Sequence, residues 1–351
     1  MKRNALLPAA ASCLVLGACM YACERIPNRA EIDFGSFSAD ETVVATPQIL
    51  STEAWQFGGQ AGHTIRTTHY RIYTTETNQV LRDRMAAFLE YSLAHYRTVL
   101  AQLPAPPVRL DTYLMDNRPQ WENLTRRLMG SEADQLTTIQ RGGFASRGIG
   151  VYYDLGLFDT LAIAGHEGWH QYTQRTFRDP LPVWLEEGLA TYMEGHRWKN
   201  NIPQFLPWAN TERFDQLRGA ARRGNLLALE DLLGSKPQDH LGQTSNDRLL
   251  TYYAQVWAMT HFLAEGEGGK YSASLRRLLE DAAAGDMRAV IAQKHDQRAA
   301  NLALATRVGS QVFTAYFNAD LAAAQAEYEA FVKGIVKTGG REAIVAGRSP
   351  Q

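Results

Sequence analysis

Two histidines and a glutamate lie within five consecutive residues, His166-Glu167-Gly168-Trp169-His170. Residues four apart in an α-helix project from the same face, one turn apart, so both imidazoles can reach one metal ion. This spacing is typical of helices that bind Zn²⁺ through the two histidines. Glu167, one step round the helix, can take a proton from a water molecule at the metal and pass it to a leaving amine. These residue types therefore predict metal-assisted hydrolysis.

A catalytic zinc site needs a third protein ligand, and the next segment supplies carboxylates. Residues 183–194 read Val-Trp-Leu-Glu-Glu-Gly-Leu-Ala-Thr-Tyr-Met-Glu, and Pro182 before them suits the first turn of a helix. Two histidines and one glutamate, with an open fourth position, form a catalytic zinc composition. Adjacent helical residues point about 100° apart, so either Glu186 or Glu187 can face the metal, but not both. Glu194 is either a supporting group behind the ligands or a solvated acid at the helix end.

The elements that must position these groups follow an α+β pattern. Alternating β-branched and aromatic residues predict strands at residues 67–74 and 108–115, and a glycine-rich edge strand at 142–153. Apolar residues at helical spacing predict helices at 78–103, 119–128 and 157–177, the last of which carries both histidines. Further helices are predicted near 226–233, 251–265, 271–284, 287–293 and 312–337, the last broken near Asn318 with Asn318 or Asp320 as a cap. The order predicts a small mixed sheet packed on a mostly helical C-terminal half.

The N-terminus predicts export from the cytoplasm. Lys2 and Arg3 precede an apolar stretch at residues 5–18 that is too short to span a bilayer. Residues 16–19, Leu-Gly-Ala-Cys, then resemble the bacterial lipobox, in which the cysteine becomes the lipid-modified first residue. A plain secretory signal cut nearby is the alternative. We therefore expect a bacterial cell-envelope location, with attachment to the membrane through lipid on Cys19.

This pattern divides the chain into four parts. Residues 1–18 form the signal, residues 19–63 an irregular tether and leader, residues 64–338 the folded domain, and residues 339–351 a disordered tail. The composition, 45% hydrophobic and 21% charged over 351 residues, is that of a globular protein. Lys and Arg number 36 against 37 Asp and Glu. With no basic excess, the sequence predicts no nucleic-acid partner.

The cysteines restrict the chemistry of the metal site. Of the three cysteines, Cys13 lies in the signal and Cys19 carries the predicted lipid, so only Cys23 remains. A single thiol can form neither an internal disulfide nor a cysteine-ligated zinc site. Any metal must therefore be held by histidines and carboxylates.

The segment His-Glu-Gly-Trp-His, followed by Trp-Leu-Glu-Glu-Gly-Leu-Ala-Thr-Tyr-Met-Glu, resembles the gluzincin clan of zinc metallopeptidases, and most closely its aminopeptidase N-type motif. The resemblance is tightest over residues 160–194. It implies a zincin-like domain, Zn²⁺ as cofactor and a peptide or protein as substrate. It also implies His166, His170 and Glu187 (the glutamate directly before the glycine) as ligands, with Glu167 as general base.

The sequence departs from the aminopeptidase pattern in two ways. Sixteen residues separate His170 from Glu187, slightly fewer than is usual in aminopeptidases. No Gly-x-Met-Glu-Asn segment precedes the zinc helix, and the corresponding strand reads Gly-Gly-Phe-Ala at residues 142–145. Because the group that holds a free substrate amine is missing, the resemblance implies a zinc peptidase and leaves exo- or endo-action open.

Other residues near the motif have two interpretations each. In the resembling enzymes a downstream tyrosine hydroxyl stabilises the tetrahedral intermediate, and here Tyr253 is the candidate, with Tyr252 as the second choice. An aromatic core stripe is the alternative for both. We interpret Gly168 as a site of close packing and Trp169 as a core residue. We interpret His196, His240 and His261 as ordinary polar residues.

Two further functions stay open beside a peptidase. The chain can be a catalytically silent, peptidase-like binding protein of the envelope, although intact metal and base residues disfavour this. It can also be a zinc hydrolase that acts on a non-peptide amide or ester, because the same chemistry activates any carbonyl.

Overall fold

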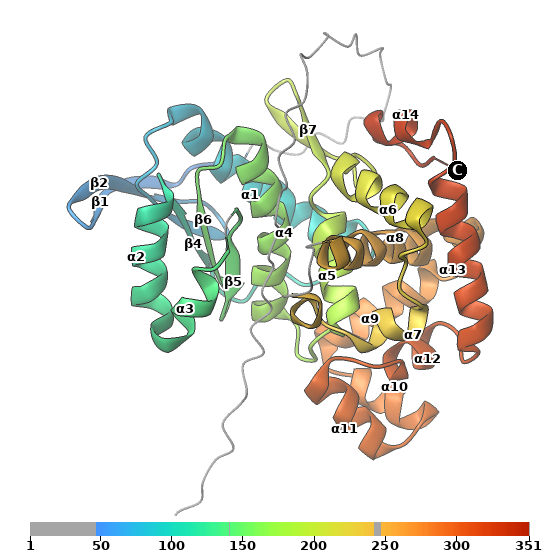
Figure 1. Ribbon diagram of the computed structural model, residues 1–351. Helices are drawn as coiled ribbons and strands as arrows, with labels where there is room; N and C mark the ends of the chain where they lie inside the picture. The colour runs from blue at the N-terminus through green and yellow to red at the C-terminus, as the bar shows by residue number, and fades with distance from the viewer. Residues whose placement is uncertain (1–46, 140, 242–246, 351) are drawn as a thin grey trace, which may run out of the picture.

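The computed structural model describes residues 47–139, 141–241 and 247–350, in which a mixed sheet carries helices on both faces (Figure 1). The strands are β1 (Ser51–Phe57), β2 (Gln60–Arg66), β3 (Tyr70–Thr74), β4 (Leu110–Met115), β5 (Phe144–Ser146) and β6 (Ile149–Tyr153). They lie in the order β1-β2-β3-β4-β6-β5. β4 pairs in parallel with β3 and β6, and the other pairs are antiparallel. The predicted α+β class, with a helical C-terminal half, is confirmed.

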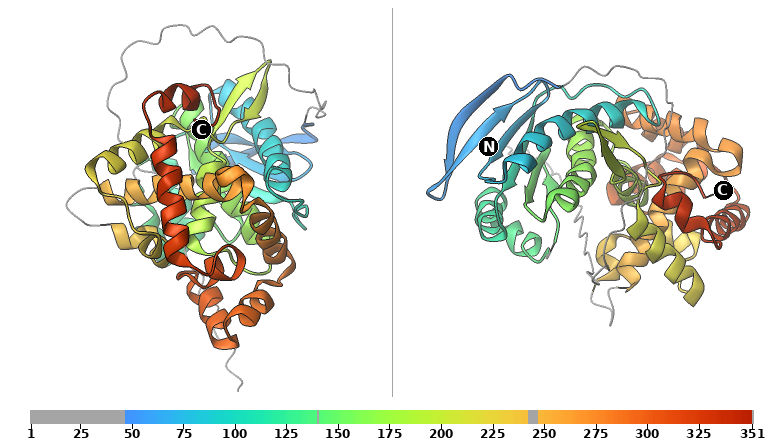
Figure 2. Two further views of the ribbon diagram at one scale, coloured as in Figure 1. Left: turned by 90° about the vertical axis from the view of Figure 1, so that its right-hand side faces the viewer. Right: turned by 90° about the horizontal axis from the view of Figure 1, so that it is seen from above.

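Alternating side chains of these strands supply two separate cores. Leu114 of β4 and Tyr152 of β6 point into the larger core, which is shared with α1 (Gln79–Thr98) and the helices beyond it. Met115 and Val151, each one residue away, point to the opposite face, which is covered by α2 (Arg118–Met129) and α3 (Ala133–Leu136). This two-residue period is what a sheet buried on both faces requires. Seen from above, α2 and α3 lie on the side of the sheet away from the helical half (Figure 2, right).

A 3-10 turn, η1 (Gly130–Glu132), joins α2 to α3. The elements that follow β6 form the helical half of the molecule. They are α4 (Leu157–Thr176), α5 (Val183–Tyr192), the hairpin strands β7 (His196–Lys199) and β8 (Ile202–Phe205), α6 (Thr211–Arg223), α7 (Leu229–Gly234), the 3-10 turn η2 (Pro237–His240), α8 (Asp247–Gly269), α9 (Ser272–Ala284), α10 (Met287–Lys294), α11 (Gln297–Thr306), α12 (Gln311–Tyr316), α13 (Leu321–Ile335) and α14 (Gly340–Val345). The predicted break near Asn318 is confirmed, because α12 ends at Tyr316 and the side chain of Asp320 caps α13 by accepting from the backbone N–H groups of Ala322 and Ala323. No helix of the described ranges is long and apolar enough to cross a membrane.

Helix α4 lies at the centre of the molecule, between the sheet and α5 (Figure 1). Every residue from Thr160 to Thr173 is buried, including the polar ones. A surface helix of a globular protein has one apolar stripe, whereas a helix buried on all sides belongs to the interior. Both histidines of the motif are therefore held by protein on every side of their helix.

Close approach of α5 to α8 depends on a glycine. All ten residues of α5 are buried, and α8 packs along it through a buried run at residues 251–263. A Cβ at Gly188 would lie 2.5 Å from Thr260 Oγ1 and 2.6 Å from the carbonyl oxygen of Val256. Only glycine allows the two helix backbones to pack at this spacing.

Three expectations about element boundaries were wrong. Residues 51–63 belong to β1 and β2 and not to an irregular leader, because the two strands pair with each other and Phe57 is buried. Residues 142–153 form the hairpin β5–β6 and not one strand, because Arg147 and Gly148 adopt positive φ angles and turn the chain. The tail contains α14, which buries Ile344. Helices α6 and α11 and the hairpin β7–β8 were not predicted. The predicted signal and the lipobox lie outside the described residues.

We expect Gly188→Ala to lower the free energy of unfolding by about 1–3 kcal/mol, because α5 and α8 must separate to admit the methyl group. The matched control is Gly234→Ala at the end of α7, where a new Cβ would meet no atom within 4 Å. Thermal unfolding followed by circular dichroism measures both. Equal melting temperatures for the two variants would contradict the close contact.

A second stability prediction concerns Glu76, at the junction of β3 and α1. Burial raises the pKa of Glu76 from 4.5 to about 7, although the backbone N–H of Asn78 partly opposes this. A carboxyl with a raised pKa favours folding while it is protonated, and this contribution is lost as the pH rises to 7. Relative to Glu76→Gln, the wild type should therefore lose on the order of 1–3 kcal/mol between pH 4.5 and pH 8. Denaturant unfolding of both proteins at the two pH values provides the measurement, and a pH-independent difference argues against it.

Candidate metal centre

Three ligand atoms from α4 and α5 converge in the interior. His166 Nε2 lies 3.3 Å from His170 Nε2, and Glu187 Oε2 lies 3.6 Å and 3.7 Å from these two nitrogens. All three side chains are buried. Two ligands bound tetrahedrally to zinc at about 2.0–2.1 Å lie about 3.3–3.4 Å apart. The group therefore has the spacing of ligands around one ion and can hold a metal.

Each histidine is oriented by a second carboxylate at its other nitrogen. His166 Nδ1 lies 2.8 Å from Glu194 Oε1, and His170 Nδ1 lies 3.0 Å from Glu186 Oε1. Of the two adjacent glutamates that the sequence left open, Glu187 faces both Nε2 atoms. Glu186 faces the back of His170. Glu194 is buried as well, so it is not a solvated helix-end acid.

These contacts fix which ring nitrogens carry hydrogen. An ionised carboxylate only accepts, so Nδ1 of each histidine is the donor to its glutamate. In the neutral imidazoles, both Nε2 lone pairs then point at one another and at Glu187 Oε2. Three electron-rich atoms at this spacing repel one another unless a cation lies between them. Carboxylates behind metal-bound histidines are a common way of orienting the ligand and raising its basicity.

The same charges attract a cation to the centre. Burial alone lowers the pKa of His166, but the carboxylates of Glu187 and Glu194 outweigh it and raise that pKa to about 9. For His170, burial is likewise outweighed, chiefly by Glu187 and Glu186, so its pKa is raised well above 6.5. Burial raises the pKa of Glu187, but the two histidines dominate and lower it to about 2. The site therefore favours positive charge, as a proton or as a metal ion.

The carboxylate of Glu187 provides an independent test of whether a metal fits. Its side chain is fully buried, and neither Oε1 nor Oε2 has a hydrogen-bond partner. A buried ionised carboxylate without hydrogen bonds is costly, and proteins pair such groups or use them to coordinate metals. The donor set of two imidazoles and one carboxylate thus fits a metal ion that takes nitrogen and oxygen ligands.

Glu167 lies on the side of α4 that faces the edge strand. It is almost completely buried, and its Oε2 atom has no hydrogen-bond partner. Burial raises the pKa of Glu167, while the positive potential of His166 and His170 and the backbone N–H of Ala145 lower it in part. Gln174, two turns further along α4, donates from Nε2 to the carbonyl oxygen of Ala145 at 3.1 Å. Strand β5 is thus fixed to α4 beside Glu167.

The two candidate tyrosines take different positions. The ring of Tyr253 lies 6.4 Å from the ring of His166, centroid to centroid, and the guanidinium of Arg213 lies 5.2 Å over it. The hydroxyl of Tyr252 instead donates to the carbonyl oxygen of Ser235 at 3.3 Å. Tyr253 is therefore the tyrosine whose ring packs beside the metal ligands, and its catalytic role stays a prediction.

The other residues of the motif and the other histidines take structural positions. A Cβ at Gly168 would lie 2.7 Å from the Tyr96 hydroxyl, so close packing is confirmed. Trp169 is fully buried among aromatic rings. In the part of the chain that the structure describes, the one group with metal-ligand spacing is the triad, and His196, His240 and His261 do not belong to it.

Three residues around the centre were not predicted. Asn210 caps α6 and donates from Nδ2 to Glu194 Oε2 at 2.6 Å. Arg213, one turn into α6, donates to Glu194 Oε1 at 3.1 Å. Arg307 lies more than a hundred residues beyond the motif and approaches Glu186. The sequence does contain a helix-start signal for α6, because Asn210 can cap a helix whose apolar residues include Phe214 and Leu217. The many charged residues of this segment make the apolar pattern weak.

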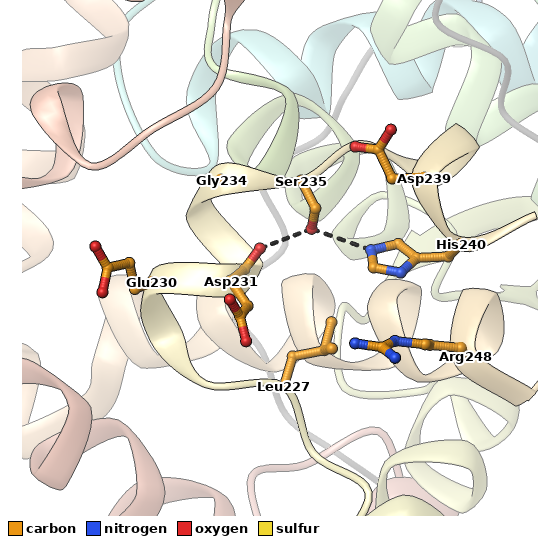
Figure 3. A pocket seen from close by; sticks show the side chains of 8 residues that line it. All are labelled: Leu227, Glu230, Asp231, Gly234, Ser235, Asp239, His240 and Arg248. Carbon is orange, nitrogen blue, oxygen red and sulfur yellow. Dashed lines mark hydrogen bonds between the residues drawn. The ribbon is translucent and has the colours of Figure 1, made fainter.

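A separate cavity of about 330 Å³ lies between α7, η2 and the start of α8 (Figure 3). Its wall contains Ser235 and His240, with 3.0 Å between Oγ and Nε2. Because Ser235 Oγ donates to the carbonyl oxygen of Asp231 at 2.7 Å, His240 Nε2 must be the donor in the pair. A histidine that donates to serine cannot take its proton. We therefore interpret this pair as a local cap and not as a nucleophile.

Comparison with known proteins adds a family without an assigned function. A family model described as a protein of unknown function, DUF1570, matches residues 160–282. The matched segment runs from α4 into α9 and contains the triad, Glu167 and Arg213, whereas β5 and Arg307 lie outside it. The chain is thus similar to this family over about a third of its length. No curated protein matches the chain.

The geometry predicts different outcomes for the two adjacent glutamates. Glu187→Gln should lose stoichiometric zinc on dialysis, because it removes the charged ligand atom. Glu186→Gln should bind about 10- to 100-fold more weakly than wild type, as expected for a group behind a ligand, and still take up one equivalent of added zinc. Metal analysis and chelator competition measure both variants. The reverse ranking would make Glu186 the ligand.

Proposed function

We propose that the protein is a zinc-dependent peptidase of the gluzincin type. The observation that carries this proposal is the convergence of His166, His170 and Glu187 on one point, with the buried carboxylate of Glu167 one step round the same helix. Metal, third ligand and base are the parts that hydrolysis of an unactivated amide requires. Similarity to a family of unknown function neither adds to this proposal nor argues against it.

Zinc is the metal that the donor set favours. Two imidazole nitrogens and one carboxylate oxygen are the ligands of many catalytic zinc sites, while magnesium and calcium take mainly oxygen ligands. The residues that the structure describes contain no cysteine, so the ligands that converge here are imidazole and carboxylate groups alone. A bound zinc ion would supply Lewis-acid activation of a water molecule and of the substrate carbonyl.

Glu167 supplies the proton transfer in this proposal. Its Oε2 atom is buried and without a hydrogen-bond partner, so it can accept a proton from the attacking water and deliver it to the leaving amine. Burial raises the pKa of Glu167, which brings a carboxylate closer to the basicity that such transfer needs near neutral pH. We propose that Tyr253, beside His166, donates its hydroxyl to the oxyanion of the intermediate.

The position of β5 favours a peptide as the substrate. This strand is the edge of the sheet, and its Ala145 contacts Glu167. An extended peptide can lie alongside such a strand, with side chains pointing alternately to either side. A peptide beside β5 brings a backbone carbonyl towards Glu167 and the triad, whereas a non-peptide ester would use no such strand.

We also propose that the enzyme works at the bacterial cell envelope, tethered by lipid on Cys19. The support comes from the N-terminal sequence, in which two basic residues, an apolar stretch and Leu-Gly-Ala-Cys follow one another. From Cys19 to the start of β1 at Ser51 the chain has about thirty residues, enough to separate the domain from the membrane.

Glu167→Gln tests the mechanism. It removes the base and keeps the shape of the side chain, so hydrolysis should fall by about 100- to 10,000-fold while zinc content stays at one equivalent. The measurement is cleavage of a peptide library by zinc-loaded wild type and variant, read by mass spectrometry. The surface substitution Glu280→Gln serves as the control.

Other outcomes of the same experiment separate the remaining functions. Cleavage that is unaffected by Glu167→Gln would refute the assigned base. A zinc-loaded wild type that cleaves no peptide but hydrolyses ester or non-peptide amide probes would identify a different hydrolase. Inertness toward all of these probes would favour a binding protein.

A further inference from the structure

The buried metal centre contains more negative charge than its ligands alone would bring. Glu167, Glu186, Glu187 and Glu194 are all at most 5% exposed, and they lie on or beside the two helices of the motif. Burying several carboxylates together is unfavourable unless positive groups accompany them. Two arginines from the helical half meet this requirement, and each contacts a carboxylate behind a different histidine.

The first arginine is Arg213 of α6, whose side chain is 2% exposed. Its Nη2 lies 3.1 Å from Glu194 Oε1, the oxygen that also accepts from His166 Nδ1 at 2.8 Å. The cap of the same helix, Asn210, holds the other oxygen of Glu194. The guanidinium of Arg213 also covers the ring of Tyr253. One helix therefore fixes the support of His166 and the adjacent tyrosine.

The second arginine is Arg307, at the corner between α11 and α12. Its Nε donates to the carbonyl oxygen of Leu181 at 2.7 Å, and its own carbonyl oxygen accepts from the backbone N–H of Val183 at 2.8 Å. Nη2 lies 3.9 Å from Glu186 Oε2, at a cavity of about 230 Å³ that His170 also lines. Arg307 thus holds the start of α5 and places positive charge behind Glu186.

The backbone of Arg307 is strained in this position. Its φ angle is +61°, in the left-handed region that residues other than glycine and asparagine rarely adopt. A side chain held there requires surrounding contacts to maintain it. As the C-cap of α11, Arg307 bonds through its backbone N–H to the carbonyl oxygen of Ala303, and the segment that begins α5 holds its carbonyl oxygen and side chain.

We propose that Arg213 and Arg307 are positioning residues that set the charge and the ligand geometry of the metal centre through Glu194 and Glu186. This inference rests on the proposed metal site. With neutral imidazoles and an ionised Glu167, four carboxylates and two guanidinium groups leave two negative charges, which one divalent cation neutralises. The two arginines thus bring the net charge of the buried cluster to the value that one divalent ion neutralises.

Removing an arginine has two opposing effects on metal affinity. It takes away a positive charge that repels the metal ion, and it weakens the carboxylate that supports a histidine ligand, which is the larger effect. A guanidinium repels a metal ion, but its paired carboxylate largely cancels that field at the metal. Without the guanidinium, a buried carboxylate is left uncompensated, which is strongly unfavourable. Glu194 or Glu186 can relieve this by turning away from its histidine, and this movement removes the acceptor that orients the ring. Metal affinity should therefore fall.

The test measures zinc dissociation constants by competition with a chromophoric chelator on the full-length protein. We expect Arg213→Met and Arg307→Met each to weaken binding by about 10- to 100-fold, and the corresponding lysine variants, which keep the charge, to bind more tightly than the methionine variants. At position 307 the lysine and methionine variants share the same backbone conformation and both lack the Nε bond to Leu181, so the comparison between these two isolates charge. Arg341→Met, which breaks an exposed ion pair to Asp215 of α6, is the control and should bind like wild type.

A double variant tests whether Arg213 acts through Glu194. Once Glu194→Gln has removed the charge, adding Arg213→Met should weaken zinc binding by less than about threefold. Additive losses, or zinc affinities within twofold of wild type in both methionine variants, would overturn the inference. If Arg213→Met does not fold, Arg307→Met and the lysine variants still decide. Because the readout is metal affinity, a protein that binds zinc as expected but cleaves no peptide refutes only the proposed peptidase function.

Discussion

Three electron-rich atoms repel one another at one buried point, and the rest of the structure must hold them there. The Nε2 atoms of His166 and His170 and Oε2 of Glu187 lie within 3.7 Å of one another. Folding alone gives no reason to bring such atoms together away from water, because each loses solvation and gains an unfavourable neighbour. Their arrangement becomes favourable when a cation joins them, so the protein must hold the ligands in place whether or not a cation is present.

Rigid packing of three backbones holds the ligands. Gly168 of α4 lies beneath the Tyr96 hydroxyl, which itself donates to the carbonyl oxygen of Gly165. At Gly165 a side chain would meet the carbonyl oxygen of Met193 at 2.9 Å, and at Gly188 it would meet α8. These glycines give up helix propensity of about 1 kcal/mol each in exchange for close contact. Their placement on both sides of the ligands is what makes the site rigid enough to bind one ion in fixed geometry.

The sequence could predict what is local and could not predict what is brought together by the fold. His166, Glu167 and His170 follow from a spacing within one helix, and Glu187 from a short motif nearby. The strands β1 and β2 were not predicted because they lack a strong alternating pattern, since much of β1 is exposed and Phe57 is its one buried residue. Arg307 reaches Glu186 from a corner 121 positions along the chain. No periodicity relates such residues, because their contact is decided by the packing of whole helices.

The link between β5 and α4 has a consequence for the proposed chemistry. Ala145 binds Glu167 through its backbone N–H, and its carbonyl oxygen accepts from Gln174, so both of its backbone groups are held by α4. A peptide that lies beside this edge of the sheet therefore meets a strand already fixed to the helix that carries the base, and the outward backbone groups of Ala145 are occupied by Glu167 and Gln174. In an aminopeptidase-type site the acidic group that captures the substrate amine would follow on this strand, and here Phe144 and Ala145 occupy the corresponding segment. In the proposed peptidase this strand favours recognition through the backbone and side chains of a longer peptide.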